Sequence, residues 1–134
     1  MKKKFSVILA GFLGLFLMAF VTKESFQKEW KVPDADKNKV NPQKADAASL
    51  ANGKTLYNTH CKSCHGNKGK GDGPKAAQLD TDCGDFSKPA FQAQTDGALY
   101  YKTEKGRKDM PSYKTKIPDE NNMWAVVNYM RTLK

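Results

Sequence analysis

The distribution of apolar positions divides the sequence into three parts, and the first is an apolar run at residues 5–21. The run follows three lysines and has no polar face at any helical period, which argues against a buried core helix. Its length lies between the hydrophobic part of a signal peptide and a membrane-spanning helix, and the residues around Ala19 make a poor cleavage site. We therefore expect residues 1–22 to be a signal peptide or an uncleaved N-terminal membrane anchor, and we favour the anchor.

Residues 23–45 are polar and mixed in charge, and they contain Pro33 and Pro42. This composition predicts a linker, a stalk, or an arm that lies over the domain that follows. Trp30 belongs to a short apolar stretch in this segment, and we expect it to pack on the protein's own surface.

Apolar residues recur at helical spacing in three segments of the remaining chain, residues 46–57, 96–106 and 118–133. Runs of β-branched residues are few, so residues 46–134 are expected to form one all-α domain. Gly53 lies in the first predicted helix, where glycine is costly, and we expect it to let the last helix approach closely. Aromatic contacts from Trp124 or Tyr129 should accompany that crossing.

The segments between these helices are rich in turn-forming residues and predict loops. Phe86 and Phe91 lie in the longest of them, residues 76–94, and are expected to form apolar walls. Pro118 and the acidic residues after it suit the start of the last helix.

The first of these loops begins with Cys61-Lys62-Ser63-Cys64-His65, which reads C-x-x-C-H. Two thiols at this spacing can add to the two vinyl groups of one porphyrin, and the adjacent imidazole can then ligate the iron. The motif therefore indicates one covalently attached haem c, held through Cys61 and Cys64 with His65 as an axial ligand.

Other functions of a C-x-x-C pair fit less well. A redox-active dithiol is expected after a strand, which the pattern lacks. A zinc site needs four ligands, and the chain has three cysteines and two histidines without a second paired cluster. A structural disulfide would close a loop too short to stabilise the fold much.

A six-coordinate haem iron requires a second axial ligand, and Met110 is the candidate. Met1 and Met18 lie in the N-terminal segment, whereas Met123 and Met130 lie in the last predicted helix, where packing is the expected role. Met110 stands in a loop before a proline, far enough along the chain to reach the opposite haem face.

An iron-bound histidine donates its other N–H to an acceptor, often a backbone carbonyl. The glycine-rich loop at residues 66–74 ends at Pro74, whose carbonyl is our candidate partner for His65. The same loop lacks the residue order of a phosphate-binding loop and follows no predicted strand.

The formal net charge of +9 favours acidic protein partners or anionic membrane surfaces. The lysines are scattered among acidic residues without a basic helix, so we do not expect nucleic-acid binding. The expected docking face comprises the lysines nearest the motifs, namely Lys62, Lys68, Lys70, Lys75, Lys105, Lys108 and Lys114.

Two further residues could be reactive but are expected to have no role. Cys83 is an odd thiol in a polar loop, where exposure is expected. His60 directly precedes Cys61 and is expected to be solvated.

From about Ala47 to Leu133 the chain resembles a class I, mono-haem cytochrome c. The resemblance implies a small helical fold whose first and last helices cross, a partly exposed haem edge, His65 and Met110 as axial ligands, and Pro74 as the hydrogen-bond partner of His65. Cys83 and Pro118 depart from the family pattern. The motifs that carry the resemblance are Gly53-x-x-Leu56-Tyr57, Cys61-x-x-Cys64-His65-Gly66, Gly71-Asp72-Gly73-Pro74, Gly106-x-x-x-Met110-Pro111-x-Tyr113 and Trp124-x-Val126-Val127-x-Tyr129-Met130-Arg131.

The expected function is one-electron transfer in a respiratory or other periplasmic chain, with acidic redox proteins as donor and acceptor, and not enzymatic catalysis. The expected location is the periplasm or the outer face of the cytoplasmic membrane, with membrane association possible through residues 5–21. One alternative is a cytochrome c subunit tethered to an oxidase or dehydrogenase complex. Another is a haem enzyme or gas-binding protein with an open iron position, which requires that Met110 is not a ligand.

Overall fold

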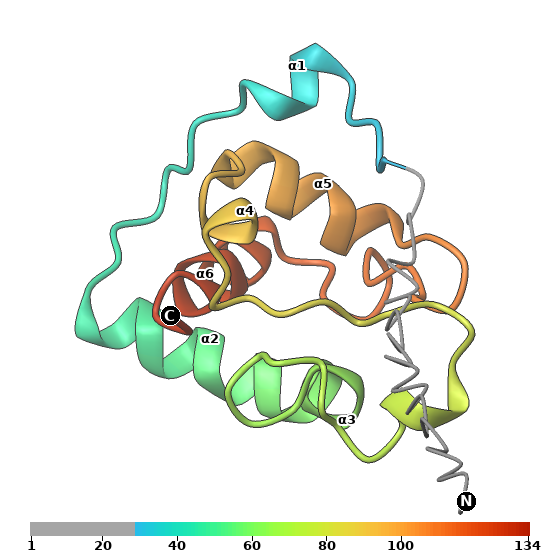
Figure 1. Cartoon of the computed structure of the whole chain (residues 1–134). Helices are drawn as coiled ribbons and strands as arrows, with labels where there is room; N and C mark the ends of the chain where they lie inside the picture. The colour runs from blue at the N-terminus through green and yellow to red at the C-terminus, as the bar shows by residue number, and fades with distance from the viewer. Residues whose placement is uncertain (1–28) are drawn as a thin grey trace, which may run out of the picture.

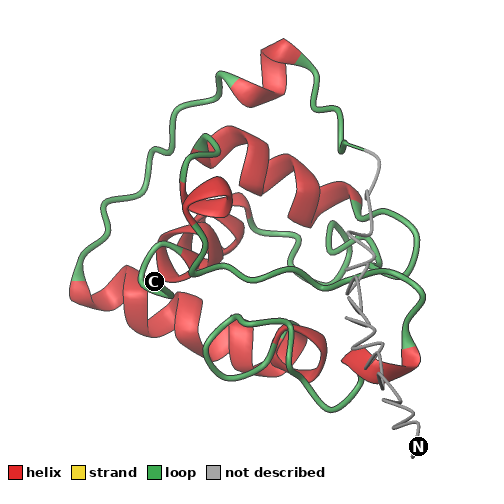
Figure 2. Cartoon of the chain, viewed as in Figure 1, coloured by secondary structure: helices red, strands yellow, loops and turns green. Residues whose placement is uncertain are grey.

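The computed structural model describes residues 29–134, and within them every regular element is a helix (Figures 1 and 2). This confirms the all-α prediction for the cysteine-containing domain. The elements in chain order are α1 (Asp34–Lys37), α2 (Ala47–His60), α3 (Lys62–His65), the 3-10 helix η1 (Ala76–Gln78), α4 (Pro89–Gln92), α5 (Asp96–Lys105) and α6 (Glu120–Met130).

Side-chain caps fix where the three longer helices begin. Asp46 accepts a hydrogen bond from the Ser49 N–H at the start of α2. At the start of α5, the Thr95 side chain accepts one from the Ala98 N–H. For α6 the cap is Asp119, so this helix begins at Glu120 and not at Pro118 as the sequence pattern predicted. Pro118 therefore lies one residue before the cap, outside the helix.

Helices α2 and α6 pack against each other at Gly53, as the sequence predicted. A β-carbon at this position would lie 2.0 Å from the carbonyl oxygen of Ala125 and 3.0 Å from the β-carbon of Tyr129. The Tyr129 ring also packs on Tyr57 of α2, with 5.2 Å between ring centroids. The Trp124 ring packs instead on Tyr100 of α5, with 4.3 Å between ring centroids.

The core lies where α2, α5 and α6 meet. Tyr57, Val126 and Val127 are completely buried there, and Met123 and Leu99 are almost so. Burying each aliphatic side chain of this kind stabilises the folded chain by roughly 1.5–3 kcal/mol. The two outer helices α1 and α4 are single turns, and neither buries a residue.

Residues 29–45 lie as an arm over the domain, which is one of the three arrangements expected for this segment (Figure 1). Thr95 Oγ1 donates to the Lys37 carbonyl at 2.6 Å, and Asn41 Nδ2 donates to Asn128 Oδ1 at 2.8 Å. A β-carbon at Gly97 would lie 2.2 Å from the Asp36 carbonyl oxygen, so α5 and the arm are in close backbone contact.

Within residues 29–134, no helix is both long and apolar enough to cross a membrane. The expected signal peptide or anchor at residues 1–22, including the apolar run at residues 5–21, lies outside the described residues.

Candidate functional site

The C-x-x-C-H motif lies where α2 gives way to the short helix α3. Cys61 closes α2 by donating its N–H to the Tyr57 carbonyl, and its own carbonyl accepts from His65 at 3.0 Å. Two tyrosine hydroxyls hold the backbone on either side of the motif. Tyr57 donates to the Gly66 carbonyl and Tyr113 donates to the His60 carbonyl, each at 2.8 Å. The motif is therefore fixed at both ends.

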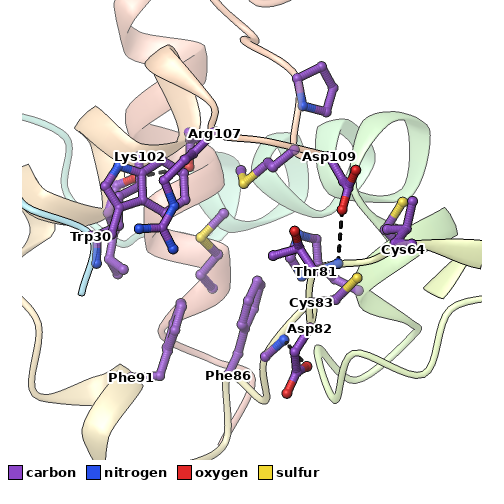
Figure 3. A pocket seen from close by; sticks show the side chains of 18 of the residues that line it. Trp30, Cys64, Thr81, Asp82, Cys83, Phe86, Phe91, Lys102, Arg107 and Asp109 are labelled. Atoms are coloured by element: carbon purple, nitrogen blue, oxygen red, sulfur yellow. Dashed lines mark hydrogen bonds between the residues drawn. The ribbon is translucent and has the colours of Figure 1, made fainter. Parts of the chain in front are cut away.

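A cavity of about 290 Å³ opens beside the motif, and Cys64 and His65 line it (Figure 3). Its walls come from distant parts of the chain, because the loop at residues 79–86, helix α5, the turn before α6 and α6 itself all contribute. Cys61 is buried, with 4% of its surface exposed, and is not among the lining residues.

Phe86 and Phe91 form an apolar wall of this cavity, as the sequence predicted. Their rings stack with 4.2 Å between centroids and an interplanar angle of 12°. The Phe86 ring also lies 4.7 Å from the His65 ring. Because the imidazole packs against an aromatic surface, its orientation is restricted before any metal binds.

His65 has the protonation behaviour of a metal ligand. Burial lowers the pKa of its imidazole, while the Cys83 backbone acts in the opposite direction. The ring is therefore neutral at neutral pH, which is the form that binds iron. Its Nδ1 atom is buried and has no hydrogen-bond partner within residues 29–134.

Pro74 lies beside the motif but not in the cavity. Its neighbours Gly73 and Lys75 donate backbone N–H groups to the carbonyls of Cys64 and Ser63 at 3.1 and 2.8 Å. Pro74 itself is exposed. The hydrogen bond from His65 Nδ1 to the Pro74 carbonyl is not formed in this structure, and it stays a prediction for the haem-bound chain.

Met110 lines the cavity, and a tight turn holds it there. Arg107 and Met110 exchange two backbone hydrogen bonds of 2.8 and 3.0 Å. Asp109 accepts from the Thr81 N–H at 2.9 Å and so joins this turn to the loop on the other side of the cavity (Figure 3). Gly106 precedes the turn with φ +68°, and a β-carbon there would lie 2.4 Å from the Pro111 carbonyl carbon.

Met130 also lines the cavity, although its place in the last predicted helix predicted a packing role. It is 4% exposed and lies on the buried face of α6. Its position next to Val127 on that face was the available signal, but helical spacing alone does not say which buried residues border a cavity. Met123 is more deeply buried and is not among the cavity-lining residues.

Cys83 lines the cavity and is partly buried, whereas the sequence predicted an exposed thiol. Burial raises its pKa, and the nearby Cys64 thiol raises it further. Burial likewise raises the pKa of Cys61 to about 12. Both thiols are therefore protonated at neutral pH.

The residues around the cavity fit a covalently held haem. The site provides a C-x-x-C pair, a neutral imidazole whose Nδ1 lacks a partner within the described chain, a thioether at Met110, and stacked aromatic walls. Imidazole and thioether ligands with apolar walls are the surroundings that haem iron has in electron-transfer proteins, and two thiols at C-x-x-C spacing attach the porphyrin.

Comparisons with known proteins agree with this site. The family model described as cytochrome c matches residues 50–134. A comparison with curated proteins found no match.

Two solved structures are similar in fold. One is a chain of the Kuenenia stuttgartiensis reducing HAO-like protein complex Kustc0457/Kustc0458, with a TM-score of 0.62 and 24% identity over 69% of this chain. The similarity spans 46% of that neighbour's length. The other is the KustC0563 c-type cytochrome, with a TM-score of 0.54 and 28% identity over 61% of this chain and 96% of that one. Since the family match covers more than half of the sequence and includes the whole C-x-x-C-H motif, the chain belongs to the cytochrome c family and carries haem c bound covalently through cysteine side chains.

Proposed function

We propose that this cytochrome c is a one-electron carrier and not an enzyme, with Cys61 and Cys64 as the thioether positions and His65 and Met110 as the axial ligands. The observation that carries the proposal is that His65 and Met110 line the same cavity as Cys64, although Met110 lies far from the motif along the chain. Two axial side chains leave no open position for a substrate or gas at the iron.

Haem c supplies a reversible one-electron redox centre when it is bound. The chain's residues keep the surroundings of that centre constant. The tyrosine hydrogen bonds fix the motif, the Arg107–Met110 bridge fixes the thioether, and Phe86 and Phe91 exclude water from one side. A rigid and apolar site needs little reorganisation between two charge states, which favours fast electron exchange.

Acidic redox proteins are the proposed partners. The seven lysines expected to form the docking face are all exposed. Lys62, Lys68 and Lys70 border one shallow hollow beside the motif, together with Pro74. A cluster of exposed cations next to the haem-bearing motif favours transient, charge-steered encounters with acidic surfaces.

We further propose that the chain acts outside the cytoplasm, at the periplasm or the outer face of the cytoplasmic membrane. The support is the sequence of residues 1–22 and the C-x-x-C-H motif. A tethered subunit of a redox complex is the second candidate. It is favoured by the apolar run at residues 5–21, and one structural neighbour is itself a chain of a protein complex.

The ligand assignment is tested with two methionine variants, because two thioethers border the cavity. Met110→Leu should abolish the far-red methionine-to-iron charge-transfer band of the ferric protein and lower its reduction potential. Met130→Leu should keep the band, since leucine preserves the volume of a packing residue. The measurement is an absorption spectrum and a redox titration of each haem-loaded variant.

If Met130→Leu lost the band and Met110→Leu kept it, Met130 and not Met110 would be the axial ligand. Rapid binding of carbon monoxide by the reduced wild-type protein would show an open iron position. That result would favour the gas-binding alternative over the electron carrier.

A further inference from the structure

The N-terminal arm crosses the domain from the cavity beside the motif to the start of α2 (Figure 1). Glu29 and Trp30 line the cavity at the beginning of the arm, whereas residues 31–60 do not. At its other end the arm meets α6, where the Asn128 amide donates to the Gln43 carbonyl at 3.2 Å. The two ends of the arm therefore lie at different places on the domain.

Two cationic side chains contact Trp30 at the cavity. The Arg107 guanidinium carbon lies 4.6 Å from the centroid of the indole ring, and the Lys102 ammonium lies 5.7 Å from it. The three side chains lie together on one side of the cavity in Figure 3. Cations over an indole face are attracted to it, and Trp30 is partly buried, so the beginning of the arm is attached to the domain and not only adjacent to it.

The middle of the arm lies against α5 at Gly97. A β-carbon at this position would lie 2.2 Å from the Asp36 carbonyl oxygen and 2.9 Å from those of Lys37 and Lys39. All three atoms belong to the backbone of the arm, so no flexible side chain can move aside. Because the φ of Gly97 is not positive, close contact with the arm and not the helix itself requires a glycine here.

Docking of the arm determines where the preceding residues are joined to the domain. The apolar run expected to enter the membrane ends at Val21. With the arm docked, residues 22–28 connect this run to Glu29 beside the cavity, and a fully extended chain of that length spans at most about 25 Å. With the arm released, residues 22–45 would form the connection, and they could span about 85 Å to the start of α2.

We propose that the docked arm holds the Trp30 side of the cavity toward the membrane, and that the redox partner is a membrane-embedded protein with an acidic surface. This inference rests on the proposed electron-carrier function and membrane tether, and it adds an orientation to them. A short connection that joins the domain beside the cavity keeps that side of the domain near the membrane. The exposed lysines near the motif suit an acidic surface on the partner.

The length of the free connection also favours a partner in the membrane. The effective concentration of a tethered domain at its partner falls roughly as the −3/2 power of linker length. Lengthening the connection from residues 22–28 to residues 22–45 would therefore lower this concentration roughly sixfold. A soluble partner gains nothing from the tether, and it would meet the side nearest the membrane least often.

The test uses the full-length, haem-loaded chain in phosphatidylcholine vesicles at high salt, which screens any attraction between the basic domain and the surface. Oxidation of the reduced haem is followed by stopped-flow absorbance with two one-electron acceptors. One is a phospholipid with a ferricenium headgroup, which is confined to the membrane, and the other is hexacyanoferrate(III) in solution. Each acceptor takes one electron from ferrous haem, and the ratio of the two rates reports how the domain is held.

Two variants release the arm, and a third is their control. Gly97→Ala introduces a methyl group that overlaps the arm backbone, and Asn41→Ala removes the 2.8 Å hydrogen bond to Asn128. Asn38→Ala makes the same change as Asn41→Ala at an exposed position of the arm. Release is measured as cleavage after Lys37 and Lys39 by a lysine-specific protease, which should be at least about tenfold faster in the first two variants.

Gly97→Ala and Asn41→Ala should lower the ratio of membrane-confined to soluble oxidation roughly sixfold, and Asn38→Ala should leave it unchanged. An unchanged ratio in the two arm variants would overturn the orienting role of the arm. The same conclusion would follow if the wild-type arm were cleaved as fast as theirs.

Failure of the orientation can be separated from failure of the electron carrier. Release of the full-length wild-type chain from the vesicles by high salt would overturn the tether and the orientation with it. A retained far-red methionine band and rapid reaction with hexacyanoferrate(III) would then leave the electron-carrier proposal intact. A wild-type protein that reacted slowly with both acceptors would contradict the carrier function as well as the orientation.

Discussion

At the scale of single residues, burial decides which side chains can react. Cys83 borders the cavity with a pKa that burial raises, and only part of its side chain is exposed. A raised pKa means a smaller thiolate fraction near neutral pH, and the thiolate is the nucleophile. The third cysteine is therefore a poor target for alkylation or oxidation in the folded chain.

This protection can be measured on the haem-loaded protein. Cys83 should react with iodoacetamide at pH 8 at least about tenfold more slowly than in the guanidinium-unfolded chain, where its pKa is that of an ordinary thiol. Mass spectrometry follows the reaction, and raising the pH should narrow the difference. Equal rates in the folded and unfolded chains would show that Cys83 is exposed.

The sequence predicted the candidate haem-attaching and iron-binding residues better than it predicted the other residues that line the cavity. Cys61, Cys64 and His65 form a local motif, and Met110 stands in a loop before a proline, so each could be found by reading along the chain. Met130 and Trp30 carry no such signal, because their positions at the cavity depend on how distant segments pack. The cavity-lining position of Cys83 likewise follows from the fold and not from its polar neighbours.

At the scale of helices, Gly53 sets how closely α2 and α6 can pack. The sequence predicted the α2–α6 crossing because glycine in a helix interior costs stability unless it has a packing role. The exact start of α6 was predicted less well, since a proline and two acidic residues compete for the cap and the Asp119 side-chain hydrogen bond decides between them. The short helices η1 and α4 were predicted as loop, because single turns have too few residues to show a period.

Gly53→Ala should destabilise the haem-loaded protein by about 2–3 kcal/mol, because the new methyl group would overlap the Ala125 carbonyl. The intrinsic preference of alanine for helix, about 1 kcal/mol, offsets only part of this cost. Guanidinium unfolding followed by circular dichroism measures the change. Lys54→Ala, at the exposed neighbouring position of α2, should unfold within about 0.5 kcal/mol of the wild type. An unfolding midpoint for Gly53→Ala equal to that of the wild type would show that α2 and α6 separate easily.

At the scale of the whole molecule, positive charge and an arm over one side of the domain are the two features that bear on the proposed docking of acidic partners. The formal net charge is +9, and the lysines around the motif are exposed. The arm covers α5, where its carbonyls at residues 36–39 approach Gly97. Approach through the lysine hollow beside the motif is left open by these contacts.

Charge reversal beside the motif should slow electron exchange with an acidic redox protein such as flavodoxin. Lys68→Glu should reduce the second-order rate constant by roughly tenfold at low ionic strength, and the difference should disappear at high salt. Lys54→Glu makes the same change of net charge at a position that does not border the hollow, and it should have a smaller effect. Stopped-flow absorbance measures the rates. Equal slowing by both variants would mean that net charge alone, and not a docking face, controls the encounter.

The hydrogen bond between Asn41 and Asn128 also bears on the order in which the molecule is assembled. It joins a segment made early in synthesis to one made almost last, so the arm is unable to dock fully until the C-terminal helix has emerged. Until then the side of the cavity bordered by Trp30 is uncovered. The contacts of the arm with α6 are therefore expected to form late in folding, and they close this side of the cavity.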